Sequence, residues 1–138
     1  MLKEKDLFCN LIYWEDSIGG YRKDLFDALS AYKPVSAYGR FLNNVGGKGV
    51  SYKEKFEILR RSKFTIAVEG CNYKGVTTEK IEQPLTHHSI PIYYGNVDIT
   101  NDYQYTLDKL SNNRQERYVN NNIINDNINI LLKIYTGI

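Results

Sequence analysis

The sequence predicts an α/β fold built on a parallel sheet. Short apolar runs rich in β-branched and aromatic residues have the composition of buried strands, and they lie at 7–13, 35–38, 64–69 and 90–94. The stretches between them place apolar residues three or four apart, as amphipathic helices do. Strands that alternate with helices form βαβ units with right-handed crossovers. We therefore expect a small Rossmann-like parallel sheet with helices on both faces.

The first predicted helix spans residues 21–32 and ends before Pro34, because the residue before a proline avoids the helical region. Its apolar stripe consists of Leu25, Phe26, Ala28, Leu29 and Tyr32.

Ser51 has the sequence context of an N-cap, with Glu54 in capping-box register, for a helix that runs to Arg61. A third helix is expected at 77–87, where Pro84 implies a kink or an early end.

After the fourth strand the pattern changes. Residues 96–104 are polar and irregular, 105–110 favour a short helix, and 114–135 carry an amphipathic pattern with an Asn-rich polar face.

Composition favours an ordinary globular domain, and we expect one domain over residues 1–138. Apolar residues make up 42% and the net charge is +2, which is too small to indicate a nucleic-acid partner. No apolar run approaches the roughly 20 residues that span a bilayer, so we expect no membrane segment. Cys9 and Cys71 are the only cysteines, and we expect free thiols.

In a parallel sheet the loops that follow the strands open on one edge, where α/β proteins bind ligands. That edge gathers Arg22, Arg40, Asn43, Asn44, Lys48, Glu69, Glu79 and Lys80. Two cations together with helix N-terminal amides suit a diphosphate, and a carboxylate suits sugar hydroxyls. The dinucleotide and P-loop glycine motifs are absent, as is an Asp-x-Asp pair for a metal-diphosphate. We therefore expect no metal site.

Each of these residues also has a structural interpretation. Arg22 and Lys80 taken singly are more often solvated helix residues than ligands. Glu79 in a first turn complements the helix dipole, and a site role and a structural role are equally open for Glu69. For His87 and His88 a role at a helix C-terminus is favoured over metal binding.

Three segments carry a more specific pattern. They read Val68-Glu69-Gly70, Val76-Thr77-Thr78-Glu79-Lys80-Ile81 and Ile90-Pro91-Ile92-Tyr93-Tyr94-Gly95. Upstream are Tyr21-Arg22-Lys23-Asp24-Leu25-Phe26 and Gly39-Arg40-Phe41-Leu42-Asn43-Asn44-Val45-Gly46. The combination resembles the donor-binding half of the α-1,3/1,4-fucosyltransferases, inverting enzymes that use GDP-fucose, and it runs from about residue 7 to 98.

This resemblance implies the donor-binding half of a GT-B glycosyltransferase. It implies that Arg22 and Lys80 hold the GDP diphosphate, that Glu79 bonds sugar or ribose hydroxyls, and that Glu69 lines the same pocket. The predicted donor-binding set is Arg22, Lys80, Glu79, Glu69, Thr78, Asn44 and Tyr94. Glu79 and Glu69 would also support catalysis. The donor is a substrate, and no cofactor or metal is expected.

The chain also departs from the family pattern. Gly70 stands where the family has Asn or Ser, Val76 where it has Tyr, and Tyr94 where it has Trp. The family's acceptor-binding N-terminal half, which supplies the presumed catalytic base, is expected to be absent, and no residue here is an evident substitute. A second domain or subunit would have to bind the glycan acceptor.

Three functions stay open at this point. The chain is an α-1,3-fucosyltransferase-like donor domain that transfers fucose to an N-acetylglucosamine-containing glycan, a non-catalytic nucleotide-sugar-binding or interaction domain, or a transferase for another nucleotide sugar. Whether it is an active enzyme by itself stays open too. We expect a cytoplasmic protein, peripheral at a membrane in a bacterium or virus, or a fragment of a Golgi-lumen enzyme in a eukaryote.

Overall fold

The computed structural model of the protein describes residues 4–71, 74–96 and 98. In chain order these residues form β1 (Leu7–Leu11), α1 (Tyr21–Ser30), β2 (Val35–Ala37), α2 (Tyr52–Arg61), β3 (Ser62–Val68), α3 (Glu79–Thr86) and β4 (Ile90–Tyr94). The strands pair in parallel in the order β2-β1-β3-β4. The prediction of a small Rossmann-like parallel sheet is confirmed.

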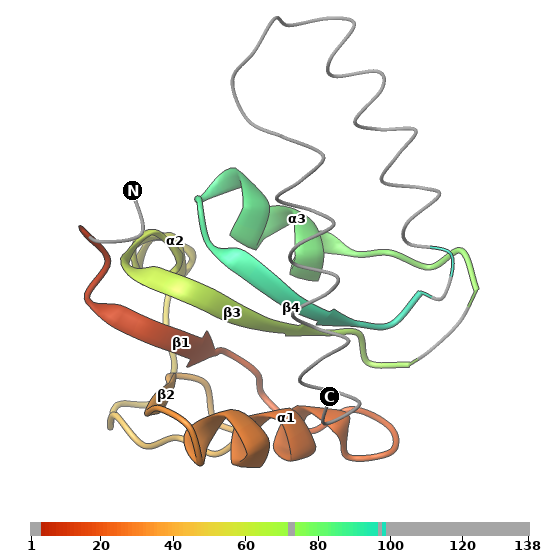
Figure 1. The fold of residues 1–138 in the computed structure, drawn as a ribbon, viewed down its shortest axis with the longest axis horizontal. Helices are drawn as coiled ribbons and strands as arrows, with labels where there is room; N and C mark the ends of the chain where they lie inside the picture. The colour runs from red at the N-terminus through yellow and green to blue at the C-terminus, as the bar shows by residue number, and fades with distance from the viewer. Residues whose placement is uncertain (1–3, 72–73, 97, 99–138) are drawn as a thin grey trace, which may run out of the picture.

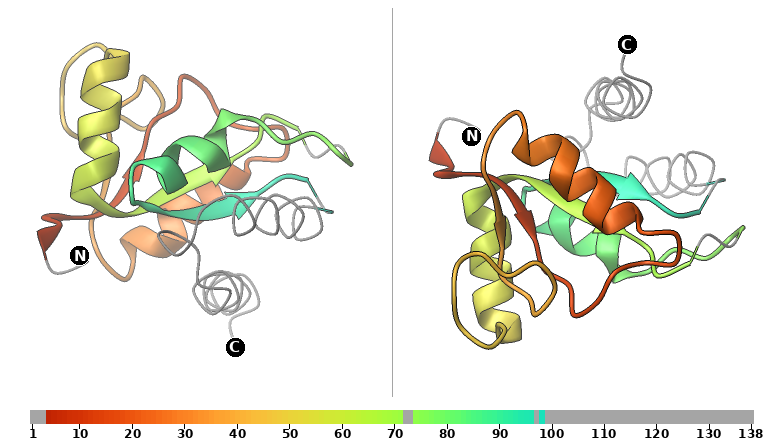
Figure 2. Two further views of the ribbon diagram at one scale, coloured as in Figure 1. Left: turned by 90° about the horizontal axis from the view of Figure 1, so that it is seen from above. Right: turned by 90° about the horizontal axis from the view of Figure 1, so that it is seen from below.

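Helices cover both faces of the sheet (Figure 1). From β1 the chain crosses toward one edge, and from β2 and β3 it crosses toward the other edge. Right-handed crossovers therefore place α1 on one face and both α2 and α3 on the opposite face. The two views in Figure 2 show this directly, with α2 and α3 over the sheet from above and α1 over it from below.

The two faces of the sheet differ in polarity. The apolar core on the α1 side consists of Cys9, Leu11, Leu25, Leu29, Val35, Ala37, Ile66, Val68 and Ile92. On the opposite face Asn10 Nδ2 donates to Thr65 Oγ1 at 2.8 Å, and the Thr65 and Ser89 hydroxyls lie 2.6 Å apart. Because successive strand residues point to opposite faces, β1 and β3 bury apolar side chains under α1, and on the face toward α2 and α3 they bury the polar Asn10 and Thr65.

Helix α1 ends at Ser30, two residues before the predicted end at Tyr32. Tyr32 is 73% exposed, so its predicted place on the buried stripe is wrong. It lies beyond the last helical turn, outside the 3.6-residue register that buries Leu25 and Leu29. Arg22, one turn before Leu25, is also buried in this helix.

Helix α2 begins as predicted. The Glu54 backbone N–H donates to the Ser51 hydroxyl, and the Ser51 N–H donates to the Glu54 carboxylate, which completes a capping box. Helix α3 contains Pro84 and continues past it to Thr86, one residue before the predicted end at His87, so the early end expected at the proline is not seen.

Cys9 and Cys71 are free thiols, as expected, and Cys9 is buried. No helix in residues 4–71, 74–96 and 98 combines the length and the apolar character that crossing a membrane requires. The helices predicted at 105–110 and 114–135 lie outside the described residues.

Candidate functional site

The site begins at the carboxyl ends of β1 and β3, which are neighbours in the sheet. β1 leads through α1 to one side, and β3 leads through α3 to the other side. This reversal of direction is the topological switch point, where open α/β sheets bind ligands.

Glu69 follows β3 directly and is 3% exposed. Its carboxylate accepts hydrogen bonds from the backbone N–H of Thr78 at 2.9 Å and from the Thr78 hydroxyl at 2.7 Å. The Tyr93 hydroxyl donates to it at a longer 3.5 Å. Glu69 therefore fastens the end of β3 to Thr78, the N-cap of α3.

The Glu69 side chain packs directly against the backbone of Gly95. A β-carbon at that position would lie 2.4 Å from Glu69 Cγ and 2.7 Å from the Tyr93 hydroxyl, both far inside van der Waals contact. The close approach explains why a glycine follows β4 at this point.

Lys80 and Glu79 open helix α3. The Lys80 ammonium lies 3.4 Å from the Glu79 carboxylate, 3.7 Å from that of Glu69 and 3.2 Å from the Thr78 hydroxyl. Its side chain is 23% exposed, while that of Glu79 is 52% exposed. The structure thus brings Glu69, Thr78, Glu79 and Lys80 together, and it leaves Lys80 accessible from one side.

The pKa of Glu79 is lowered. Burial acts to raise this pKa, but the Glu79 backbone N–H and the nearby Lys80 and Lys55 outweigh burial. A carboxylate held in its charged form accepts hydrogen bonds well and is a weak proton acceptor. Glu79 is therefore suited to bind hydroxyl groups.

Arg22 reaches the end of β3 from the α1 side. Its Nε and Nη2 donate to the Val68 carbonyl at 3.2 and 2.9 Å, and Nη1 donates to the Glu15 carbonyl at 2.8 Å. The guanidinium carbon lies 3.8 Å from the centre of the Tyr13 ring. Arg22 and Lys80 thus hold consecutive residues, Val68 and Glu69, from the two faces of the sheet.

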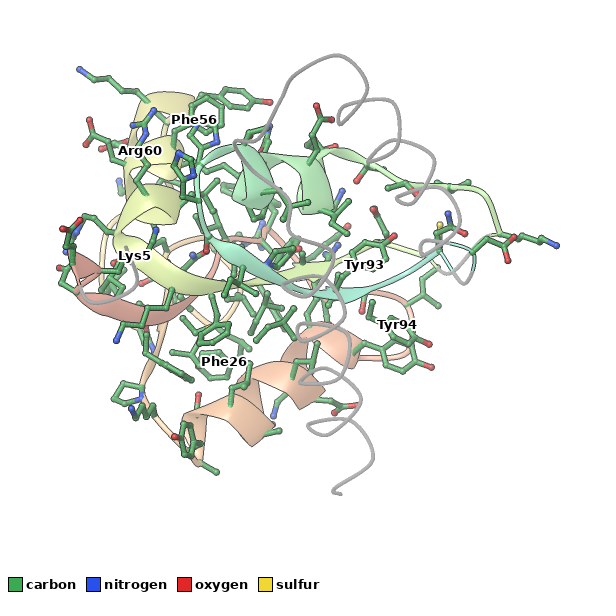
Figure 3. The ribbon with its side chains drawn as sticks, turned by 45° about the horizontal axis from the view of Figure 1, so that its top comes forward. Lys5, Phe26, Phe56, Arg60, Tyr93 and Tyr94 are labelled. Carbon is green, nitrogen blue, oxygen red and sulfur yellow. The ribbon has the colours of Figure 1, made fainter. Side chains whose placement is uncertain are left out.

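Two other predicted donor-binding residues have structural partners. Asn44 donates to the Val35 carbonyl and accepts from the Ala37 N–H, both at 2.8 Å, so its side chain extends the hydrogen bonding of edge strand β2. The Tyr94 ring lies 4.2 Å from that of Tyr21 at the start of α1. Figure 3 shows Tyr94 beside α1, whereas Tyr93 lies on the α3 side of β4. A donor contact of Asn44 or Tyr94 stays a prediction.

A pocket of about 140 Å³ opens between α2, α3 and the polar face of β1 and β3. Its lining residues are Asn10, Ile12, Tyr13, Trp14, Lys55, Leu59, Thr65, Ile66, Glu79, Lys80, Gln83 and Pro84. The predicted residues Glu79 and Lys80 form part of its wall, so the pocket adjoins the site at the switch point.

Sequence reasoning missed Lys55 and Trp14. Lys55 lies four residues before the buried Leu59, so it shares the inner face of α2. This spacing in the sequence could have predicted that Lys55 faces the sheet. Trp14, three residues after β1, is 61% exposed and also lines an open hollow of about 330 Å³ with Arg40.

Among the described residues, no group of three or more His, Cys, Asp or Glu side chains is arranged to hold a metal ion. His87 follows α3, and its ring stacks on Phe56 at 4.3 Å between centroids.

Comparison with known proteins identifies the family. The C-terminal domain of glycosyltransferase family 10 (fucosyltransferase) matches residues 3–129. The chain belongs to this family. The fold class and the similarity to fucosyltransferases expected from the motifs are therefore confirmed.

Relatives at about one third identity agree with this assignment. The alpha-(1,3)-fucosyltransferase FucT of Helicobacter pylori is 34% identical over 82 residues, which cover 59% of this chain and 16% of that protein. A candidate fucosyltransferase of Acanthamoeba polyphaga mimivirus is 32% identical over 107 residues, or 71% of this chain and 18% of that protein. The chain thus spans less than a fifth of these relatives.

Solved structures show the same fold. An alpha1,3-fucosyltransferase crystallised with GDP-fucose superposes with a TM-score of 0.62 at 30% identity, covering 72% of this chain and 28% of that one. An alpha1,3-fucosyltransferase structure with GDP gives the same TM-score and covers 27% of that chain.

Proposed function

We propose that this chain is the GDP-fucose-binding domain of an inverting fucosyltransferase with α-1,3 specificity. The observation that carries the proposal is the Glu79–Lys80 pair at the mouth of the switch-point pocket of a family 10 chain. A similar structure solved with GDP-fucose supports the choice of donor.

The two predicted cations would act on the diphosphate in different ways. Lys80 is partly exposed and presents a compact point charge beside the pocket. Arg22 uses three of its five N–H groups on carbonyls, which leaves two for a phosphate oxygen. At 5% exposure, Arg22 would reach that oxygen only at the surface of the β3 end.

The other predicted residues would shape the donor site. Glu79 would accept hydrogen bonds from ribose or fucose hydroxyls, while Glu69 and Thr78 fix the direction of the first turn of α3. For Asn44 and Tyr94 we propose support of the loops on the same edge, through β2 and through Tyr21.

In the transfer reaction the bond between fucose C1 and the GDP β-phosphate oxygen breaks as the acceptor hydroxyl oxygen bonds to C1 from the opposite side. The bonding electrons leave with GDP, whose growing negative charge the cations stabilise without reorganising. The acceptor proton goes to a general base. We propose that this base and the glycan site belong to a second domain or subunit, and that no metal takes part.

A non-catalytic nucleotide-sugar-binding domain is the second candidate. It is favoured by the two departures in the loop before α3: the space beside Gly70 is open for 4 Å, and Val76 is 42% exposed. The side chains that the family places there are therefore missing from the surface of the donor site.

Calorimetry with GDP, GDP-fucose and a UDP-sugar tests the proposal. We expect heat with both guanine ligands and none with the UDP-sugar. Absence of binding by GDP and GDP-fucose would contradict the donor-domain function. Binding without transfer to an N-acetyllactosamine acceptor, when the chain is supplied with an acceptor domain of the same family, would favour the second candidate.

A further inference from the structure

Lys55 lies on the α2 wall of the pocket, and Glu79 and Lys80 lie on the α3 wall. Its side chain is half-buried, unlike the exposed Lys53 on the same helix. Within the described residues, the Lys55 ammonium makes no hydrogen bond and no ion pair within 4 Å. A cation partly removed from water without a partner costs folding free energy.

The electrostatic surroundings of Lys55 are those of a partly buried cation without a close partner among the described residues. Burial lowers the pKa of Lys55, Glu79 acts to raise it, and Lys80 acts to lower it further. Lys80 lies within 4 Å of two carboxylates, whereas Lys55 senses Glu79 only at longer range. Two ammonium groups therefore line the pocket. Carboxylates neutralise the charge of Lys80 on α3, whereas no carboxylate of the described residues pairs with Lys55 on α2.

The pocket also borders polar atoms that lack partners. Asn10 is fully buried, and its Oδ1 has no hydrogen-bond partner among the described residues. The amide orientation is fixed, because Nδ2 donates to the Phe64 carbonyl, which can only accept. Gln83 Oε1, on the α3 wall, is also buried without a partner.

Unpartnered buried polar atoms of this kind are rare in folded proteins and call for an explanation. Here two of them, on β1 and α3, border one pocket together with the half-buried ammonium group of Lys55 on α2, which the described residues leave unpaired. An incoming polar ligand with its ordered water would supply acceptors to Lys55 and donors to Asn10 and Gln83. The arrangement is therefore that of a binding site, with its groups prepared before the ligand arrives.

We propose that Lys55 is a further phosphate-binding residue of the nucleoside diphosphate site, acting across the pocket from Lys80. This inference rests on the proposed function, because it assigns a role within the same donor site. Fucose transfer gains from a second ammonium group at the diphosphate, since the charge on the leaving diphosphate grows as the sugar departs.

The test compares Lys55→Met with the matched control Lys53→Met on the exposed side of the same helix. Binding of GDP and of guanosine to each variant is measured by calorimetry, and thermal unfolding is measured without ligand. Guanosine keeps the base and ribose but lacks the phosphates, so it isolates the charge-assisted contact.

For Lys55→Met we expect about tenfold weaker binding of GDP, as for loss of one charge-assisted hydrogen bond, and unchanged binding of guanosine. Lys55→Arg keeps the charge and should retain most of the GDP affinity. The midpoint of unfolding should stay equal or rise in Lys55→Met, because an unpaired, partly buried charge is removed.

Equal GDP affinity of wild type and Lys55→Met would overturn the inference while leaving the proposed function intact. So would an equal loss of guanosine and GDP affinity, which would place Lys55 near the nucleoside. A wild-type chain that binds no GDP would remove the proposed function itself, and the inference with it.

Discussion

The Glu69 carboxylate accepts both the backbone N–H and the hydroxyl of Thr78, at 2.9 and 2.7 Å. These two bonds connect Glu69, the residue that follows β3, to the N-cap of α3 across the intervening loop. Because Glu79 and Lys80 are the next two residues, the direction in which they enter the pocket depends on this contact.

Glu69→Ala removes a buried acceptor, leaves two Thr78 donors without their partner and removes one of the two carboxylates beside Lys80. We expect it to lower the free energy of unfolding by about 2–4 kcal/mol, as for breaking a buried hydrogen-bonded charge pair. Urea denaturation measures this change. Glu57→Ala, at an exposed position of α2, is the control and should change stability by less than about 0.5 kcal/mol. Equal stability of the two variants would show that the Glu69 contact is dispensable.

Arg22→Ala should affect both stability and binding. The guanidinium bonds two backbone carbonyls and stacks on Tyr13, so its loss leaves carbonyl oxygens unpaired, at a cost of about 2–4 kcal/mol. Arg22→Lys cannot reproduce the forked geometry of the guanidinium, so it should recover only part of the lost stability. Thermal unfolding and GDP titration are the measurements, with the exposed neighbour variant Lys23→Ala as control. An Arg22→Lys protein as stable as wild type would contradict the structural role.

The two glycines that flank Glu69 should respond differently to substitution. Gly95→Ala forces the new β-carbon against Glu69 Cγ, so we expect a loss of stability and weaker GDP binding. Gly70→Asn meets open space and restores the side chain that the family has there, so stability should hold and GDP-fucose affinity should rise a fewfold. Calorimetry on both variants tests this. Gly95→Ala with wild-type affinity would disprove the packing argument.

The capping box of α2 predicts a dependence of stability on pH. The Ser51 hydroxyl and backbone N–H lower the pKa of Glu54 below its usual value of 4.5. A lowered native pKa means that the carboxylate stabilises the fold above the unfolded pKa and loses this effect as the pH falls through the native pKa. The gap in unfolding temperature between wild type and Glu54→Gln should therefore shrink between pH 6 and pH 3. A gap independent of pH would show that the charge of Glu54 does not contribute.

The sequence was sufficient for the sheet, because strands buried on both faces leave continuous apolar runs with clear ends. It was also sufficient for the start of α2, where Ser51 and Glu54 define a capping box from local spacing alone. Tyr32 was misjudged because its helix ended two residues early, and an apolar pattern does not fix where a helix ends.

The site was less predictable than the fold. Glu69, Thr78, Glu79 and Lys80 come together because they flank one strand–helix connection, so local order implied their proximity. The depth of the pocket and the place of Lys55 depend on how α2 packs beside α3, a tertiary relationship between segments far apart in the chain. The extent to which Arg22 binds backbone carbonyls likewise could not be inferred from its helix position.

The affinity of wild type and Lys80→Ala for GDP, measured side by side by calorimetry, tests the central claim most directly. The account predicts that the wild-type chain binds GDP and that Lys80→Ala binds it at least about tenfold more weakly, which corresponds to roughly 1.5–3 kcal/mol for a charge-assisted contact. Equal affinities of the two proteins, or no binding of GDP by the wild-type chain, would contradict it.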